Sequence, residues 1–101
     1  MQILFNTQKI SITDSFKARI TKKFEQGLGK FLVHYQEDLK VGLISIEKVA
    51  SENYEIKFDM NLPGCPVNIK ATHKILLDGL MEVRDQAKRQ IKKNLEILRE
   101  R

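Results

Sequence analysis

The stretch Tyr54-Glu55-Ile56-Lys57-Phe58-Asp59-Met60-Asn61-Leu62 has the clearest periodicity in the chain. Apolar and polar side chains alternate along it, which predicts a β-strand with one buried side and one solvent-facing side. Pro63-Gly64 follows as a turn, and Val67, Ile69 and Ala71 continue the alternation as a last strand. This part of the chain therefore predicts an antiparallel hairpin with one apolar face.

Two more strands are expected ahead of this hairpin. Residues 39–49 alternate again, and the polar run 50–53 that follows is typical of a turn, so this segment should pair antiparallel with the hairpin. Its first alternating apolar residues are Leu39, Val41 and Leu43. Residues 2–6 are rich in β-forming side chains and predict the first strand.

An amphipathic helix is predicted at about residues 14–26. Thr13 or Asp14 is a good N-cap, and apolar side chains then recur at i,i+4 spacing on one face. Gly27 and Gly29 weaken a helix and are expected to end this one. The apolar residues of the stripe are Phe16, Ile20, Phe24 and Leu28.

A second, longer helix is predicted from about His73 to Arg101, with Thr72 as its cap. At 1.5 Å per residue it would span roughly 43 Å, so its end should project beyond a sheet of this size. Its apolar seam consists of Ile75, Leu76, Leu80, Ala87, Ile91, Leu95 and Leu98.

The order strand, helix, three antiparallel strands, helix predicts an α+β fold. Because each element has one apolar face, the economical arrangement is a βαβββα two-layer sandwich, with both helices packed on one face of a four-stranded sheet. A chain of 101 residues is expected to form one domain, residues 1–101.

The basic residues are segregated along the chain, which has a net charge of +5 and an isoelectric point near 9.4. Residues 14–31 hold five Lys and Arg against two Asp and Glu, and residues 72–101 hold eight against five. Residues 32–71 hold only four against six. Positive charge therefore lies on the two predicted helices, and a polyanion that docks against helices is the first partner to expect.

Composition also restricts the cellular setting. The single cysteine, Cys65, excludes an intrachain disulfide and suits a reducing cytoplasm. The first residues do not resemble a signal peptide, and no stretch approaches the roughly eighteen apolar residues of a membrane span. We therefore expect a cytoplasmic protein with no membrane partner and no small-molecule substrate.

The densest basic segment lies on the second helix between Gln86 and Leu95, where no acidic residue occurs. Its cations form two i,i+4 pairs, and a basic pair on the first helix adds a second row, as suits contact with a nucleic-acid backbone. The plain alternative is a solvated face with local ion pairs worth about 0.3 kcal/mol each. The predicted binding residues are Lys22, Lys23, Arg84, Lys88, Arg89, Lys92 and Lys93.

No other group of residues indicates a catalytic or metal-binding site. His34 and His73 lack ligand spacing to any Cys, Asp or Glu, and nothing near Cys65 supplies a base. Glu47 and Glu55 fall on adjacent predicted strands, where such a pair is more often solvent-facing than catalytic. We expect no catalytic residue, no metal site and no cofactor.

Base stacking is not indicated by the aromatic residues. Most phenylalanines occupy core-phase positions, and only Phe31 and Tyr35, in the segment after the first helix, could be exposed.

Several short stretches of this sequence are similar to stretches of a known protein family and occur in the same order. They are Met1-Gln2-Ile3, Ile12-Thr13, Lys23-Phe24, Ile46-Glu47-Lys48-Val49, Asp78-Gly79-Leu80-Met81 and Arg89-Gln90-Ile91-Lys92-Lys93. Their order and spacing resemble the short ribosome hibernation-promoting factors and the ribosome-associated inhibitor of the sigma-54 modulation family. The resemblance covers nearly the whole chain. Where that family usually opens its last helix with an Asp-Met-Tyr type motif, this chain has Thr72-His73-Lys74.

The resemblance implies a ribosome hibernation factor. Such a protein would bind rRNA of the small ribosomal subunit in the channel used by mRNA and tRNA, and would inhibit translation by steric occlusion. A general double-stranded RNA-binding module is the alternative, because a sheet with two helices on one face also suits that role. An enzyme acting at Cys65 or the histidines is the third class.

Overall fold

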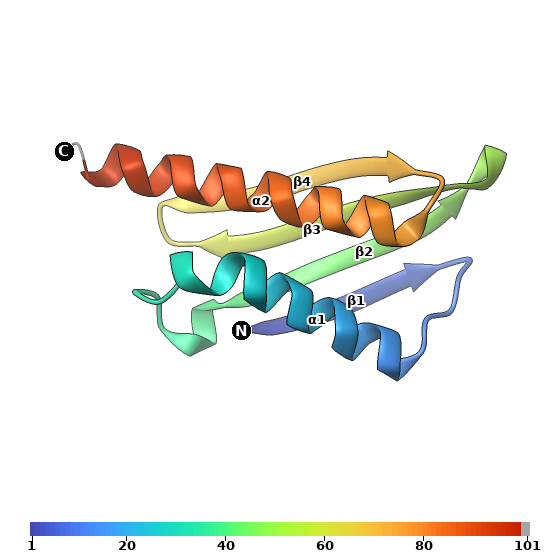
Figure 1. Ribbon diagram of the computed structural model, residues 1–101, viewed down its shortest axis with the longest axis horizontal. Coiled ribbons are helices and arrows are strands. Elements are labelled where there is room, and N and C mark those ends of the chain that lie inside the picture. The colour runs from blue at the N-terminus through green and yellow to red at the C-terminus, as the bar shows by residue number, and fades with distance from the viewer. Residues whose placement is uncertain (100–101) are drawn as a thin grey trace.

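The computed structural model contains a four-stranded sheet with two helices side by side on one of its faces (Figure 1). The structure describes residues 1–99, with side chains for residues 1–50 and 52–97. This arrangement confirms the predicted βαβββα two-layer sandwich. The elements are β1 (Gln2–Gln8), α1 (Asp14–Leu28), β2 (Val41–Val49), β3 (Asn53–Leu62), β4 (Cys65–His73) and α2 (Leu76–Arg99), with short 3-10 helices η1 (Gly29–Phe31), η2 (Glu37–Leu39) and η3 (Ala50–Glu52).

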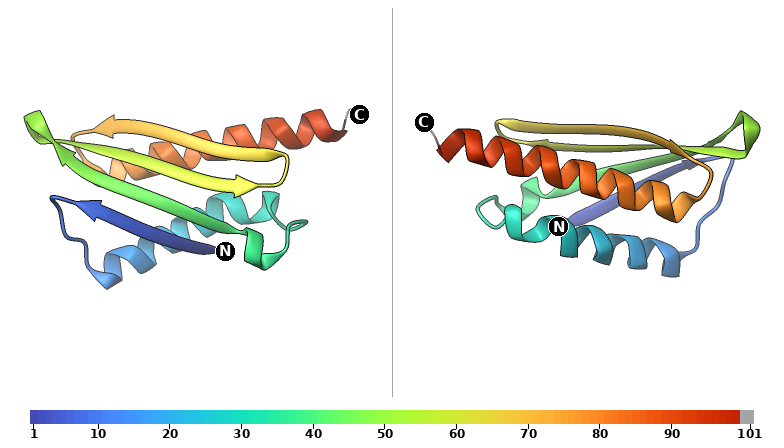
Figure 2. Two further views of the ribbon diagram at one scale, coloured as in Figure 1. Left: turned by 180° about the vertical axis from the view of Figure 1, so that it is seen from behind. Right: turned by 45° about the horizontal axis from the view of Figure 1, so that its top comes forward.

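The strands lie in the order β1-β2-β3-β4, and one face of the sheet is free of helices (Figure 2). Strands β2, β3 and β4 pair antiparallel, as the alternation predicted. Strand β1 pairs with β2 in parallel, with Gln2 opposite Val41. Parallel neighbours need a long crossover, which α1 supplies by returning the chain across the sheet.

The β3–β4 hairpin is closed by the predicted turn at Pro63-Gly64. Gly64 has φ +75°, a conformation that glycine adopts without steric penalty. The register places Leu62 opposite Cys65 and Phe58 opposite Ile69, so the two inward-facing sets of side chains are aligned across the strands.

The core lies between the sheet and the two helices. Ile56, Phe58, Met60 and Leu62 of β3 are buried, which confirms the predicted inner face of that strand. The rings of Phe24 on α1 and Phe58 have centroids 5.2 Å apart and planes at 50°, a favourable tilted contact that joins the two layers.

Strand β2 has the opposite phase to the one its first apolar residues suggested. Gly42, Ile44 and Ile46 face the core, whereas Leu43 points to the open face. Phe58 accounts for the glycine on this inner face, because a Cβ added to Gly42 would lie 2.6 Å from Cε1 of the Phe58 ring. The ring occupies the space that a side chain at position 42 would need.

Each helix differs from its prediction at one end. Helix α1 is capped by Thr13, whose hydroxyl accepts a 3.1 Å hydrogen bond from the backbone N–H of Phe16, as predicted. It then runs through Gly27 to Leu28, because Leu28 is fully buried and continues the apolar stripe.

Helix α2 begins at Leu76, later than predicted. Thr72 is not its cap, because it pairs with Glu55 at the end of β4, and His73 pairs with Tyr54. Ile75, expected in the apolar seam, is 59% exposed ahead of the helix. The described end of α2 reaches past the sheet, as expected (Figure 1). The side chain of Leu98 and all of Arg101 lie outside the described residues.

Candidate nucleic-acid interface

The two helices run side by side in the same direction across the sheet, so their solvent-facing sides form one surface (Figure 1). The helices are in close contact at Gly27 of α1 and Arg84 of α2. A Cβ added to Gly27 would lie 2.8 Å from Cδ of Arg84 and 3.3 Å from its Nε. The arginine side chain therefore passes over the glycine and lies between the two helices.

Arg84 is also held by its neighbour in sequence. Its Nε and Nη2 donate hydrogen bonds to Oδ1 of Asp85, at 3.1 and 2.9 Å. Only 26% of the Arg84 side chain is exposed. These contacts restrict the guanidinium, which lowers the entropy that it would lose on binding a phosphate.

A first basic row lies on the flank of α2 that faces α1. Residues four apart share one line along a helix, so Lys88 and Lys92 follow Arg84 on this flank. On α1, the same spacing places Lys23 and Arg19 in line with Gly27. The space between the helices is thus lined by cations from both of them.

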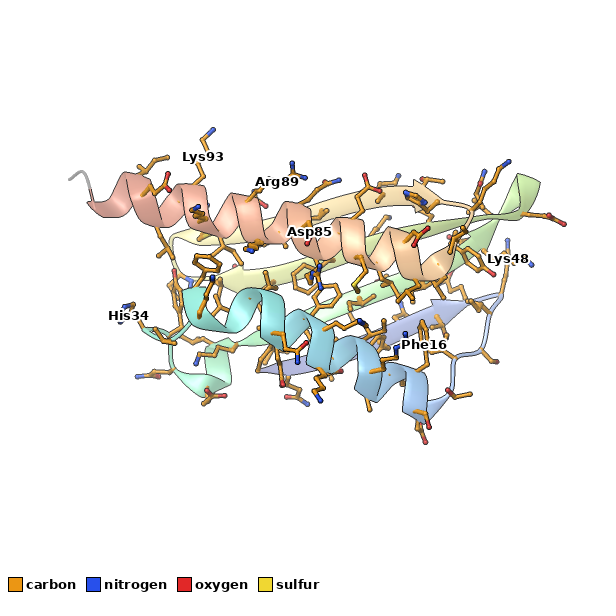
Figure 3. All side chains as sticks on the ribbon, in the orientation of Figure 1. Phe16, His34, Lys48, Asp85, Arg89 and Lys93 are labelled. Carbon is orange, nitrogen blue, oxygen red and sulfur yellow. The ribbon has the colours of Figure 1, made fainter. Side chains whose placement is uncertain are left out.

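A second basic row lies on the other flank of α2. Arg89 and Lys93 point away from α1, beyond the edge of the sheet that β4 forms (Figure 3). Lys22 is exposed on α1. The seven predicted residues therefore share one side of the molecule, but they form two α2 rows and an α1 row instead of a single patch.

The cations of this helical face are mostly free of acidic partners. Among the described residues, no carboxylate oxygen lies within 4.0 Å of a side-chain nitrogen of Lys22, Lys23, Lys88, Arg89, Lys92 or Lys93. Arg84, with Asp85, is the exception. Such a concentration of uncompensated positive charge attracts polyanions.

The open face of the sheet shows the contrary pattern. Lys57 and Lys70 both pair with Glu55, at 3.8 and 3.3 Å, and Lys9 pairs with Glu47 at 3.7 Å. The electrostatic asymmetry between the two faces therefore exceeds what net charge alone suggests.

Two cations near this interface were not among the predicted residues. Arg19 precedes Lys23 by four residues, so the i,i+4 rule applied to α1 would have identified it. Lys30 follows the helix in η1, where its Nζ lies 5.1 Å from the centroid of the Phe31 ring. No periodicity marks Lys30, because it lies beyond the end of α1.

Residues 3–99 match the family described as Sigma 54 modulation protein / S30EA ribosomal protein. The chain belongs to this family. Membership confirms the resemblance seen in the sequence and makes the chain a ribosome-associated modulation factor. No curated protein sequence is significantly similar to it.

Solved structures share the fold of this S30EA-family chain. The N-terminal domain of Protein Y from Thermus thermophilus superposes with a TM-score of 0.74 at 18% identity, covering 92% of this chain and 98% of that domain. A ribosomal subunit interface protein from Coxiella burnetii superposes with a TM-score of 0.71 at 16% identity, covering 92% and 96%.

Two residues of this S30EA-family chain that were considered for catalysis or metal binding, Cys65 and His73, contact other side chains of the fold. Cys65 is buried, and the Asn94 amide donates a 2.8 Å hydrogen bond to its Sγ. His73 Nε2 lies 3.0 Å from a carboxylate oxygen of Glu82. Within residues 1–99, no cluster of three or more His, Cys, Asp or Glu side chains is placed to hold a metal ion.

Phe31 and Tyr35 are half-buried and pack against the core, so they do not form the exposed aromatic surface that stacking on bases requires. Among the described helices, none has the length and apolar character needed to cross a membrane.

Proposed function

We propose that the protein is a ribosome hibernation factor that binds rRNA of the small ribosomal subunit through its two basic helices. It would occupy the channel used by mRNA and tRNA and block translation sterically. On this proposal residues 1–101 act as a single ribosome-binding domain in the cytoplasm, under stress or in stationary phase. The contact residues are Lys22, Lys23, Arg84, Lys88, Arg89, Lys92 and Lys93.

The contrast between the two faces carries this proposal. On the open sheet face, lysines are paired with glutamates, whereas six of the seven helical cations have no acidic partner within the described residues. Leaving like charges unpaired on one face costs the fold some repulsion, and a phosphate-rich surface relieves that repulsion by replacing its own counterions.

The geometry favours binding to RNA through the shape of its backbone and not through its base sequence. The basic rows lie along two parallel helices, and the body is elongated, with extents of 46 × 24 × 18 Å. Lysine and arginine rows on a rigid scaffold contact phosphates along a groove without reading base edges. Occlusion of a channel by such a body requires no catalytic group.

The proposal is tested with two variants of equal net charge. The helix-face variant carries Lys88→Gln, Arg89→Gln, Lys92→Gln and Lys93→Gln. The off-helix variant carries Lys9→Gln, Lys48→Gln, Lys57→Gln and Lys70→Gln, at four exposed positions outside both helices. Lys48 lies at the opposite end of the molecule from Lys93 (Figure 3).

Sucrose-gradient sedimentation with small subunits should show that the parent and the off-helix variant co-migrate with them and that the helix-face variant does not. In vitro translation should be inhibited by the first two proteins only. Equal loss in both variants would show that net charge alone drives binding and would contradict the proposed face. Equal affinity of the parent for ribosomes and for an unrelated RNA duplex would instead favour the general double-stranded RNA-binding module.

A further inference from the structure

The open face of the sheet is divided into two unlike halves. The strand register places Leu4, Leu43, Asp59 and Asn68 in one row across all four strands. The row two residues further along consists of Asn6, Ser45, Lys57 and Lys70. One half is therefore apolar and acidic, and the other is polar and holds the lysine–glutamate pairs.

The apolar half contains a concentration of exposed leucines. Leu4 is 46% exposed, Leu43 is 37% and Leu39 is 36%, and Leu4 and Leu43 are direct neighbours across β1 and β2. These are three of the six large apolar side chains that are exposed on the described surface; the other three are Val33, Ile75 and Ile97. Exposed apolar side chains that adjoin one another and are rimmed by polar residues are a candidate interaction surface.

An open hollow of about 440 Å³ lies in this half of the sheet. Its apolar lining includes Leu39, Val41, Leu43 and Pro66, and two carboxylates, Asp38 and Asp59, line it as well. We call it the Leu43 hollow. Among the residues that the structure describes, no lysine or arginine lines it.

The carboxylates of the Leu43 hollow are uncompensated. Within the described residues, neither Asp38 nor Asp59 has a lysine or arginine nitrogen within 4.0 Å. Lys40, close in sequence, is engaged instead by Glu37 at 2.9 Å. In the other half of the face, by contrast, Glu55 and Glu47 both have lysine partners.

We propose that the Leu43 hollow is a docking site for an extended basic polypeptide segment that carries an apolar side chain. The leucines would bury that apolar side chain, and the two aspartates would pair with cations on either side of it. Nucleic acid is unsuited to this surface because the carboxylates repel phosphate. Basic protein arms are common in assemblies that contain RNA, so such segments would be available.

The position of the hollow makes the two surfaces compatible. Its lining residues Leu43 and Asp59 lie on the open face of the sheet, and Figure 2 shows that both long helices cover the opposite face. A basic segment and an RNA backbone can therefore be bound at the same time. The binding chemistry of the hollow rests on residues of the opposite face, whereas the supply of basic segments rests on the proposed function, that of a protein bound to an RNA-containing assembly.

The test uses a synthetic peptide of alternating lysine and leucine, with two matched probes: a glutamate–leucine peptide and a lysine–serine peptide. Binding to the full chain is measured by fluorescence anisotropy at about 150 mM salt, where long-range attraction is screened. Only the lysine–leucine peptide should bind well. Asp59→Lys should weaken its binding about tenfold, and Leu43→Thr should weaken it without any change of charge. Glu47→Lys, a charge reversal on the same face outside the hollow, should change it less than twofold.

Circular dichroism and thermal melting should first establish that each variant is folded, as the exposure of the three positions favours. Equal binding by the parent, Asp59→Lys and Leu43→Thr would overturn the proposal, as would equal binding of the glutamate–leucine peptide. Sedimentation equilibrium without peptide tests for the other possible occupant, a second copy of this chain. A dimer that Leu43→Thr dissociates would show that the hollow takes a second copy of this chain, and would also overturn the proposal. The helix-face variant should bind the peptide as the parent does, whatever its affinity for ribosomes.

Discussion

Gly27 of α1 is the surface on which Arg84 of α2 lies. A Cβ on Gly27 would come within 2.8 Å of Cδ and 3.2 Å of Cγ of the arginine. Together with the hydrogen bonds to Asp85, this contact sets the direction of the guanidinium between the two helices.

Gly27→Ala should therefore displace Arg84 without unfolding the protein. Alanine raises helix propensity by about 0.5–1 kcal/mol, and the flexible arginine can move away from the added methyl group. We expect a melting temperature at or above that of the parent, with ribosome affinity lowered about threefold. Gly29→Ala is the matched control, because no described atom lies within 4 Å of a Cβ there and its φ is −55°. A similar affinity for both variants would show that the arrangement of Arg84 is not used in binding.

Gly42→Ala should destabilise the fold through Phe58. The added methyl group would lie 2.6 Å from Cε1 of the ring and 3.2 Å from Cδ1 of Ile3, an overpacking that costs about 1–3 kcal/mol. Urea unfolding measures this cost. In a Phe58→Leu background the ring atoms are absent, so the same change should cost less, and the double-mutant cycle should give a coupling above about 0.5 kcal/mol. Additive effects would contradict the assigned phase of β2.

Ribosome binding should be strongly salt-dependent. If about six phosphates are neutralised, affinity should fall by about three decades between roughly 50 and 200 mM salt. The helix-face variant should lower the slope of log affinity against log salt by about 3, since each lost phosphate contact removes about 0.7–0.9. The off-helix variant should keep the parental slope. A flat salt dependence of the parent would remove the electrostatic basis of the proposed function.

Glu37 should contribute a pH-dependent term to stability. Its carboxylate accepts hydrogen bonds from Nζ of Lys40 (2.9 Å) and from the amino group of Met1 (3.0 Å). These interactions, led by the bond from Lys40, hold its pKa below the ordinary value of 4.5. The contribution is thus present above pH 4.5 and is lost as pH falls through the folded-state pKa.

Thermal melts of the parent and of Glu37→Gln should therefore differ slightly near neutral pH and converge in acid. The difference should be small, because Glu37 is fully exposed and salt screens it. A gap that stays constant down to strongly acidic pH would show that the hydrogen bonds of the carboxylate do not stabilise the fold.

Periodicity predicted most of the fold because each amphipathic element had an unbroken apolar face. The alternation around Phe58 and the i,i+4 stripe through Phe24 needed no tertiary information. The expected phase of β2 was wrong because Gly42, which has no side chain to mark the pattern, lies on the inner face. Only the position of Phe58 shows why a glycine is there. The parallel pairing of β1 also depends on the crossover of α1, which no local pattern records.

The basic side of the molecule and its two rows on α2 were predictable, but the row that faces α1 was not. Spacing showed that Lys88 and Lys92 share a line and that Arg89 and Lys93 share another. Which line faces α1 is set by the contact between Gly27 and Arg84, a tertiary relationship between distant residues. The Leu43 hollow was missed for the same reason as the β2 phase, because Leu43 was expected in the alternating apolar set and lies outside the core.

The parallel pairing of β1 has a consequence for how the chain acquires its structure during synthesis. Each β1 residue meets a partner 39 positions later, so the first strand emerges from the ribosome well before β2 exists. The β2–β3 and β3–β4 hairpins pair strands that are consecutive in the sequence, so their partners emerge soon after one another. Until β2 appears, the uncharged segment Gln2–Gln8 has an unpaired edge on both sides, which is the condition under which strands associate between chains. The time before β2 emerges is therefore the time in which β1 is open to pairing with another chain, and the crossover through α1 is the segment that brings β2 back beside it.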